Sequence, residues 1–312
     1  ERKKIKLAQI LVFSGSLVAS LGIFQFLLQF TLGVSKTFNL WANYVIMPFL
    51  GNTFGKVVIA NPSWLVKISS LTYLRAIAIF PDPHMLALFL GMLFPLAVAL
   101  ALKERKKRWI IASCVIFLAD LLTFSRGGYL GLLAGFIFLL FIFRKIIVSR
   151  YKMVLFLTSV AIFLILITPN PLASRFFSSF NLKEGSNEGR ITMWEKAVET
   201  IKNYPLLGVG IGNFPLEVNS LVNYRVPIYA HNTYLDIASE SGILASFAWI
   251  GILVSAWGAF LKRAKKNVIY LGAALSLIIF ATHSLVETGI YSPVVLTLLL
   301  LILSLNNFKK QC

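Results

Sequence analysis

Long apolar runs, separated by clusters of lysine and arginine, constrain this chain more than any other feature of its sequence. Most of the runs are close to the length that a helix needs to cross a bilayer. Hydrophobic residues make up 58% of the 312 residues and charged residues only 13%, whereas about 25% of a soluble domain is charged. The sequence therefore predicts an all-α protein, a polytopic transmembrane helix bundle.

The formal net charge of +18 would also suit a nucleic-acid-binding protein, but the basic residues do not form one patch. They occur in short clusters between the apolar runs, near residues 2–6, 103–108, 144–152, 262–266 and 309–310. Cytoplasmic loops of membrane proteins show this pattern under the positive-inside rule. The expected surroundings are membrane lipids, and no nucleic-acid partner is expected.

Eight apolar runs are predicted to span the membrane, at about residues 7–31, 84–102, 109–124, 127–143, 153–168, 241–260, 267–285 and 290–306. With the basic N-terminal segment in the cytoplasm, every later basic cluster also falls there, and so do both ends of this chain. Residues 1–312 are expected to form one integral membrane domain. Because the chain opens without methionine or a cleavable signal pattern, a preceding piece with further spans is expected.

The same topology leaves two larger segments outside the cytoplasm, 32–83 and 169–240. The first contains apolar stretches and is expected to lie on the membrane surface or to dip into it. The second is a polar loop in which residues 190–203 are predicted to form an amphipathic helix, capped by Ser186 or Asn187 and ended by Pro205. Polar chemistry that the bilayer excludes can be placed in such a loop.

Two arginines of the outer face are candidate anion ligands. Arg190 is expected at the start of the amphipathic helix, where free backbone donors and a guanidinium group suit a phosphate. A surface arginine paired with Glu188 or a lipid headgroup is an equally good interpretation. Arg126 lies in a Ser-Arg-Gly-Gly turn between two apolar runs, where it would bind an anion or extend its side chain to the interface.

His231 lies just before a predicted span at the outer boundary. A histidine titrates near neutrality and can serve as a general base, although a lone interfacial histidine is more often simply solvated. Asp236 and Glu240 follow one and two turns later and could orient this region. His283 and Glu287 are spaced i, i+4, for which a local hydrogen bond is the simpler explanation.

Arg75 and Arg225 are further candidates for contact with an anionic substrate, or equally for anchoring to headgroups. No metal and no cofactor are expected. The three histidines are not grouped with ligand spacing, no Asp-X-Asp pair suggests a divalent cation, and there is no Walker motif. The Gly208 to Gly212 segment lacks a preceding strand and is not a dinucleotide fingerprint.

Several motifs together resemble the bacterial O-antigen ligase and O-antigen polymerase family of integral membrane glycosyltransferases. The motifs are spread over most of the chain: Arg75 with Phe80-Pro81-Asp82-Pro83; Ser125-Arg126-Gly127-Gly128; Gly189-Arg190 with Trp194; Gly208-Val209-Gly210-Ile211-Gly212-Asn213-Phe214; and His231-Asn232 with Tyr234-Leu235 and Glu240-Ser241-Gly242. Each motif is weak alone, and their order and shared outward placement make the set specific to the superfamily.

The resemblance implies a substrate, a glycan carried on undecaprenyl diphosphate at the outer face of the bacterial inner membrane, with the active-site loop periplasmic or extracellular. It also implies metal-independent, inverting transfer to an acceptor hydroxyl in lipopolysaccharide or other surface polysaccharide assembly, with lipid A-core as one possible acceptor. The positions that match the family's active site are Arg126, Arg190 and His231. Supporting contacts to phosphate or sugar are expected from Arg75, Arg225, Asn232, Trp194, Tyr234 and Glu240.

Three alternatives to a ligase remain at the level of sequence. A polymerase of the same superfamily would use a growing glycan as the acceptor, and fold-level likeness does not decide between the two. A transporter or flippase of lipid-linked sugars would also need outward arginines, but it would need polar residues deep in the spans, where Asp120 is the one evident acid. A non-catalytic scaffold would not depend on the arginines at all.

Overall fold

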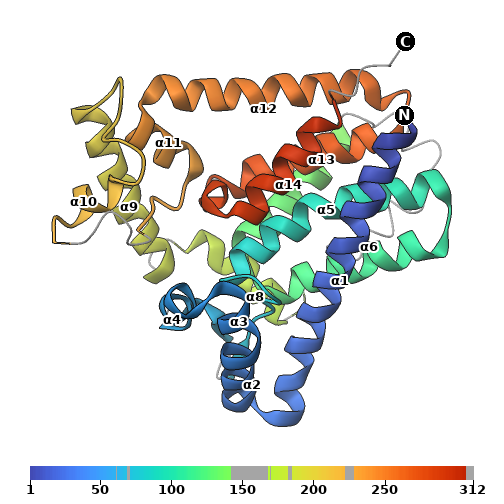
Figure 1. Ribbon diagram of the computed structural model, residues 1–312, viewed down its shortest axis with the longest axis horizontal. Helices are drawn as coiled ribbons and strands as arrows, with labels where there is room; N and C mark the ends of the chain where they lie inside the picture. Colours follow the sequence, from blue (N-terminus) through green and yellow to red (C-terminus); the bar gives the residue numbers. More distant parts are fainter. Residues whose placement is uncertain are drawn as a thin grey trace.

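The computed structural model describes residues 1–60, 62–68, 71–141, 168, 170–181, 185–221 and 228–306. This part of the chain is mostly helical, which confirms the predominantly α-helical prediction. Long apolar helices form a bundle, and shorter helices gather at the end of the bundle that lies away from the N-terminus (Figure 1).

The helices of the bundle correspond to seven of the eight predicted spans. They are α1 (Arg2–Leu32), α5 (Pro83–Glu104), α6 (Lys107–Leu122), the helix Arg126–Phe141, α12 (Ile243–Ala264), α13 (Val268–His283) and α14 (Pro293–Ser304). The predicted span at 153–168 lies outside the described residues. Helix α5 is the centre of the bundle, because it packs against α1, α6, α13 and α14 and most of its side chains are buried.

Three described helices, α1, α5 and α12, have the length and hydropathy of a membrane span. The helix Arg126–Phe141, α13 and α14 are apolar but shorter. Helix α13 ends at His283, where a turn begins, and Pro293 starts α14 after that turn. The number of eight spans therefore stays a prediction.

Three basic segments meet at one end of the bundle. Lys4 Nζ donates to the hydroxyl of Tyr270, at 2.8 Å. The Glu1 carboxylate accepts a hydrogen bond from Asn267 at 2.7 Å and pairs with Lys103 at 3.4 Å. The start of α1, the turn after α5 and the turn before α13 are thereby brought together, as the positive-inside pattern requires.

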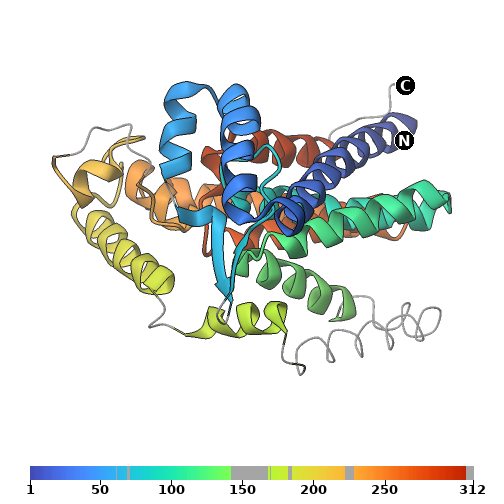
Figure 2. The ribbon, with the colours of Figure 1, turned by 90° about the horizontal axis from the view of Figure 1, so that it is seen from below.

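The first outer segment folds into a lobe of short helices beside the far end of α1 (Figure 2). Its elements are α2 (Val34–Trp41), a π-helix (Ala42–Ile46), α3 (Met47–Leu50), α4 (Asn52–Ala60) and a 3₁₀ turn (Pro62–Trp64). Trp41, Ile46 and Trp64 form its small core.

A short hairpin follows the lobe and departs from the all-α prediction. Strand β1 (Leu65–Ile68) pairs antiparallel with β2 (Leu71–Leu74), with Leu65 opposite Leu74 and Ile68 opposite Leu71. The chain then runs as non-helical backbone from Arg75 to Asp82 before α5 begins. Ala76, Ile77 and Ala78 are fully buried in this stretch, so its polar backbone groups need partners within the protein.

Two glutamines of α1 supply several of those partners, and the carbonyl of Leu122 accepts from the amide of Ala76. Gln25 accepts hydrogen bonds from the amides of Ile77 and Ala78 and donates to the carbonyl of Arg75. Gln29 accepts from the amide of Leu74 and donates to its carbonyl. Arg75 is thus held in place from the side of the first span.

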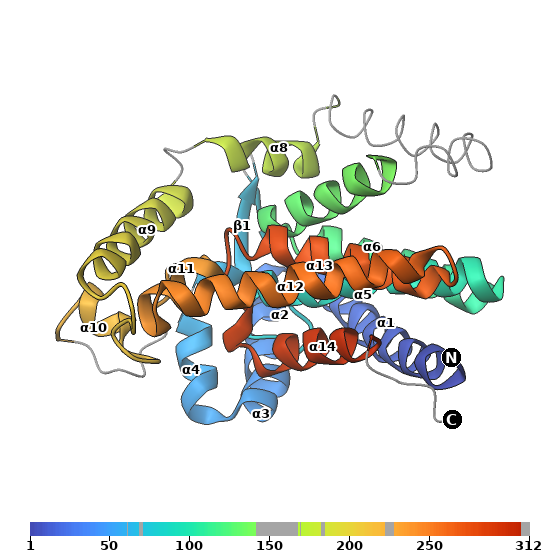
Figure 3. The same cartoon turned by 90° about the horizontal axis from the view of Figure 1, so that it is seen from above.

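The second outer segment forms α8 (Pro171–Phe177), a 3₁₀ turn (Ser178–Phe180), α9 (Gly185–Asn203), α10 (Phe214–Val218) and α11 (Thr233–Ser241). Helix α8 lies beside β1, and α9 extends away from the spans (Figure 3). Because α9 begins at Gly185, the predicted start at 190 is wrong. The predicted caps, Ser186 and Asn187, lie inside its first turn, where the Asn187 amide group donates to the carbonyl of Asn181 at 2.8 Å.

The glycine segment after α9 is a tightly packed turn against the end of α11. The amides of Val209 and Gly210 donate to the carbonyls of Ser239 and Glu240, both at 2.9 Å. A Cβ atom at Gly208 would lie 2.4 Å from the carbonyl carbon of Glu240, and the φ angle of Gly208 is +65°. Glycine is therefore needed here for backbone contact.

Candidate functional site

His231 is held at the start of α11 by the residues that follow it. Its own backbone is in the left-handed region, with φ 51°, and Asn232 caps α11 by accepting from the amides of Tyr234 and Leu235. The Asn232 amide group donates to the carbonyl of Leu285 at 3.0 Å, and the amide of Thr233 donates to the carbonyl of Ser284 at 2.9 Å. His231 is therefore fixed beside the turn that follows α13.

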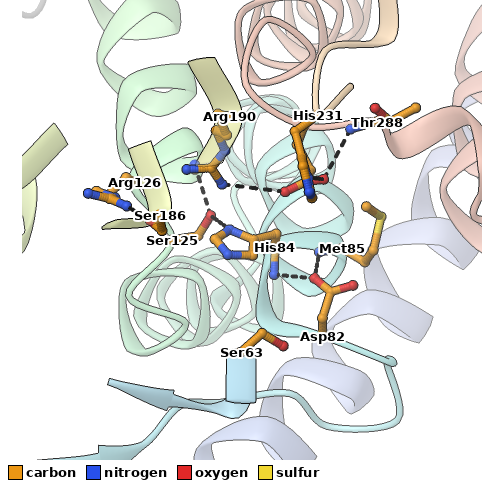
Figure 4. A network of polar contacts seen from close by, with 12 residues as sticks. Ser63, Asp82, His84, Met85, Ser125, Arg126, Ser186, Arg190, His231 and Thr288 are labelled. Atoms are coloured by element: carbon orange, nitrogen blue, oxygen red, sulfur yellow. Dashed lines mark hydrogen bonds and ion pairs between the residues drawn. The ribbon is translucent and has the colours of Figure 1, made fainter. Parts of the chain in front are cut away.

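That turn contributes Glu287, whose buried carboxylate connects two of the predicted site residues (Figure 4). Its Oε1 lies 3.0 Å from Nδ1 of His231, and its Oε2 lies 3.7 Å from Nη2 of Arg190. The structure thus brings His231 and Arg190 together through one acid, although 56 residues separate His231 from Glu287 in the sequence.

His231 and Glu287 stabilise each other's charged forms. The negative charge of Glu287 raises the pKa of His231, against the opposing effect of burial. Burial alone would raise the pKa of Glu287, but the charge and hydrogen bond of His231 and the charge of Arg190 hold it below its ordinary value. With Nδ1 bound to Glu287, Nε2 is the nitrogen left for another molecule, and 42% of the His231 side chain is exposed.

Asp236 connects the residue before His231 with the residue after Glu287. It accepts a hydrogen bond from the amide of Ala230 at 2.8 Å and another from the hydroxyl of Thr288. Burial raises the pKa of Asp236 to about 6, so its carboxylate is ionised at neutral pH. Ala230 and Thr288 are the sequence neighbours of His231 and Glu287, and the orienting role of Asp236 stays a prediction.

Arg126 connects the bundle to the start of α9. It is the first residue of the helix Arg126–Phe141, and it donates from Nη1 to the carbonyl of Ser178 at 3.1 Å and from Nη2 to the hydroxyl of Ser186. Ser186 lies one turn before Arg190 on α9. Both arginines therefore lie at the same end of α9, Arg126 next to Ser186 and Arg190 next to Ser125 (Figure 4).

Arg75 lies deeper than a substrate contact was expected to lie, with 2% of its surface exposed. Its Nε donates to the carbonyl of Thr123 at 2.6 Å and its Nη1 to the carbonyl of Ser63 at 2.9 Å. Burial, together with repulsion from Arg175, lowers the pKa of Arg75 to about 9. Its role as a direct substrate ligand stays a prediction.

The other predicted contacts are dispersed. The Tyr234 hydroxyl donates to the carbonyl of Ala281 at 2.9 Å, and Glu240 accepts from the hydroxyl of Tyr291. Trp194 is half-buried on α9, and Arg225 lies outside the described residues. The expected hydrogen bond between His283 and Glu287 is absent from the described residues, because neither ring nitrogen of His283 has a partner there.

Sequence reasoning missed Glu287 as the partner of His231, and it did not single out His84 as a site residue. His84 lies on α5 with its Nδ1 3.0 Å from the hydroxyl oxygen of Ser125. Both residues carried a usable signal, since an ionisable side chain at the end of a span is usually functional. The sequence did not show which distant residue each one would meet.

Comparison with known proteins adds an independent observation. Residues 111–250 match the family model described as O-antigen ligase. This stretch of the chain is similar to the O-antigen ligase family. The matched residues contain Arg126, Arg190 and His231, whereas Arg75 and Glu287 lie outside the match. None of the curated proteins compared with the chain matches it.

The family match and the apolar helices support a membrane enzyme of the O-antigen ligase and polymerase type. Proteins of this family are associated with glycosyltransferase activity, with a lipid-linked glycan and an acceptor as general partners.

Proposed function

We propose that this protein transfers a glycan from a polyprenyl diphosphate carrier to an acceptor hydroxyl at the outer face of the bacterial inner membrane. The observation that carries the proposal is the Glu287 carboxylate shared by His231 and Arg190. The proposal takes His231 as the base and Arg190 as the phosphate-binding cation. Their helices, α11 and α9, lie at the end of the bundle away from the N-terminus (Figure 1).

The proposed reaction is a single displacement. The acceptor oxygen attacks the anomeric carbon while His231 Nε2 takes its proton, a bond to the acceptor forms, and the bond to the carrier diphosphate breaks with inversion. Arg126 and Arg190 stabilise the charge that develops on the departing diphosphate. Glu287 holds the imidazole in the tautomer that leaves Nε2 free, and it stabilises the imidazolium that forms.

An apolar cavity supports a lipid-linked donor. The cavity has a volume of about 390 Å³ and lies between α5, α6, α13 and the helix Arg126–Phe141. Phe94, Phe136 and Leu275 contribute to its lining, and Phe176 of α8 lies on it two residues before Ser178, whose carbonyl contacts Arg126. The cavity therefore leads toward the proposed diphosphate site, as an isoprenoid chain attached to that group would require.

The test uses the purified protein in detergent with a labelled glycan on polyprenyl diphosphate, with chelator present. Lipid A-core is added in one arm and omitted in the other. Label on lipid A-core identifies a ligase, and longer lipid-linked chains without it identify a polymerase. His231→Ala should lower transfer by about 10²- to 10⁴-fold, the usual contribution of a general base.

Arg190→Ala is compared with Lys196→Ala, which removes a cation from the exposed face of the same helix. We expect the first to abolish transfer and the second to leave it unchanged. Binding of the donor without any transfer by the folded wild-type protein would overturn the enzymatic proposal and favour the transporter alternative. Equal activity of His231→Ala and wild type would remove His231 from the mechanism.

A further inference from the structure

A chain of hydrogen bonds next to the site has no role in the reaction described above. His84, on α5, lies between two residues from other segments: its Nδ1 is 3.0 Å from Ser125 Oγ, and its Nε2 is 3.5 Å from Nη1 of Arg75. An arginine can only donate hydrogen bonds, so Nε2 must accept. The hydrogen of the neutral imidazole is then on Nδ1, and His84 donates to Ser125.

Ser125 receives a second hydrogen bond, from the amide of Gly128 at 3.3 Å. A hydroxyl oxygen offers two lone pairs and one hydrogen. With both lone pairs occupied, the Ser125 hydroxyl is left with its hydrogen alone and acts as a donor. Ser125 is fully buried, and it immediately precedes Arg126 in the sequence.

The Ser125 side chain is directed toward Arg190, and Arg126 lies beyond Ser186 (Figure 4). A phosphate oxygen bound to the Arg190 guanidinium group would lie close to a hydroxyl directed toward that group. Hydrogen bonds to charged oxygen are about twice as strong as neutral ones, so such a donor would contribute measurably.

We propose that Ser125 is a third donor to the anionic phosphate oxygens of the substrate, and that His84 is a positioning residue that fixes the direction of this donor. The proposal rests on the proposed function and deepens it. Arg75 then acts through His84 and not on substrate, since the carbonyls of Thr123 and Ser63 hold its guanidinium group in place. The sequence Ser-Arg thereby supplies two adjacent ligands to one group.

The first experiment measures kcat/KM for the lipid-linked donor in Ser125→Ala and Ser125→Cys. We expect both to lose roughly ten- to a hundredfold, the range for a hydrogen bond to a charged group, with the KM for the acceptor unchanged. Cysteine fills the same space but donates weakly, so wild-type activity in Ser125→Cys would show that the residue only fills space. Ser113→Ala is the matched control, because the Ser113 hydroxyl donates to the carbonyl of Trp109 within its own helix.

The second experiment tests the role of His84 by a double-mutant cycle. His84→Ala should lower kcat/KM about as much as Ser125→Ala, and it should cost little more when Ser125 is already alanine, since coupled residues are not additive. His84→Asn, whose amide can replace the Nδ1 donor, should recover part of the activity. Full additivity of the two losses would overturn the positioning role.

Binding of polyprenyl diphosphate without a glycan separates this inference from the proposed function. It is measured in detergent on variants whose thermal unfolding matches that of wild type. Weaker binding by Ser125→Ala than by wild type supports the third donor even if no glycan is transferred. Equal binding, with equal kcat/KM where transfer occurs, overturns it.

Discussion

At the scale of single residues, Glu287 determines how His231 can act. One oxygen of its buried carboxylate lies 3.0 Å from Nδ1 of His231, and the other pairs with Arg190. A partner of this kind fixes the tautomer of an imidazole and raises its basicity. The acid also ties the position of the arginine to that of the base, so a change at Glu287 should affect both.

Glu287→Gln should shift the pH dependence of transfer. The carboxylate raises the pKa of His231, and only the neutral imidazole can accept a proton, so the wild-type rate should rise as pH increases through that raised pKa. Removing the charge lowers the pKa of His231, and the rise should move to lower pH while the maximal rate falls about tenfold or more. The measurement is kcat against pH for both proteins. An unchanged midpoint would show that Glu287 does not set the ionisation of His231.

At the scale of elements, the non-helical segment from Arg75 to Asp82 takes several of its backbone hydrogen bonds from one side chain of α1. The side chain of Gln25 alone satisfies the amide of Ile77 and the carbonyl of Arg75, at 2.8 Å and 2.9 Å. Non-helical backbone is tolerated at membrane depth only where protein or water satisfies it. Helix α1 therefore stabilises the segment that carries Arg75, the first residue of the hydrogen-bonded series Arg75, His84 and Ser125.

Gln25→Leu should both destabilise the protein and raise the KM for the lipid-linked glycan donor. It leaves buried backbone groups without partners, at a cost of about 1–3 kcal/mol for each group. Thermal unfolding in detergent and the KM for the donor are the measurements. Ser20→Ala is the control, because the Ser20 hydroxyl is exposed on the same helix and donates to the carbonyl of Ser16. A Gln25→Leu protein with wild-type unfolding temperature would contradict this role.

The helices could be predicted from the sequence because apolar runs and their breaks are local signals. The ends of α5, α6 and α12 lie within a few residues of the predicted spans. The hairpin and the segment after it could not be predicted, since their stabilising partners lie far away in the sequence, on α1, α2 and α6. The site was predictable to the same extent: Arg126, Arg190 and His231 stand out locally, whereas the contact of His231 with Glu287 exists only once α11 packs against the turn after α13.

At the scale of the whole molecule, two ends of the bundle differ in chemistry. One end gathers the start of α1 and the turns after α5 and α12, with their lysines and arginines. The other end carries α9 and α11 (Figure 1), and there Glu287 contacts His231 and Arg190. A protein with a single orientation in the membrane needs its basic turns at one end of the helices and its outward-facing residues at the other. Under the positive-inside rule we expect the basic end in the cytoplasm and the site on the opposite side.

Labelling with a membrane-impermeant thiol reagent tests this orientation in intact cells. Cys114 and Cys312 are first replaced by serine, because Cys114 is an exposed free thiol. Lys202→Cys, on the exposed surface of α9, should react from outside, whereas Lys265→Cys, in the turn between α12 and α13, should react only after the membrane is permeabilised. Both positions are exposed in the folded protein, so a difference in labelling reports the membrane and not burial. The reverse pattern would place the site in the cytoplasm, and there a carrier presented at the outer face could not reach His231.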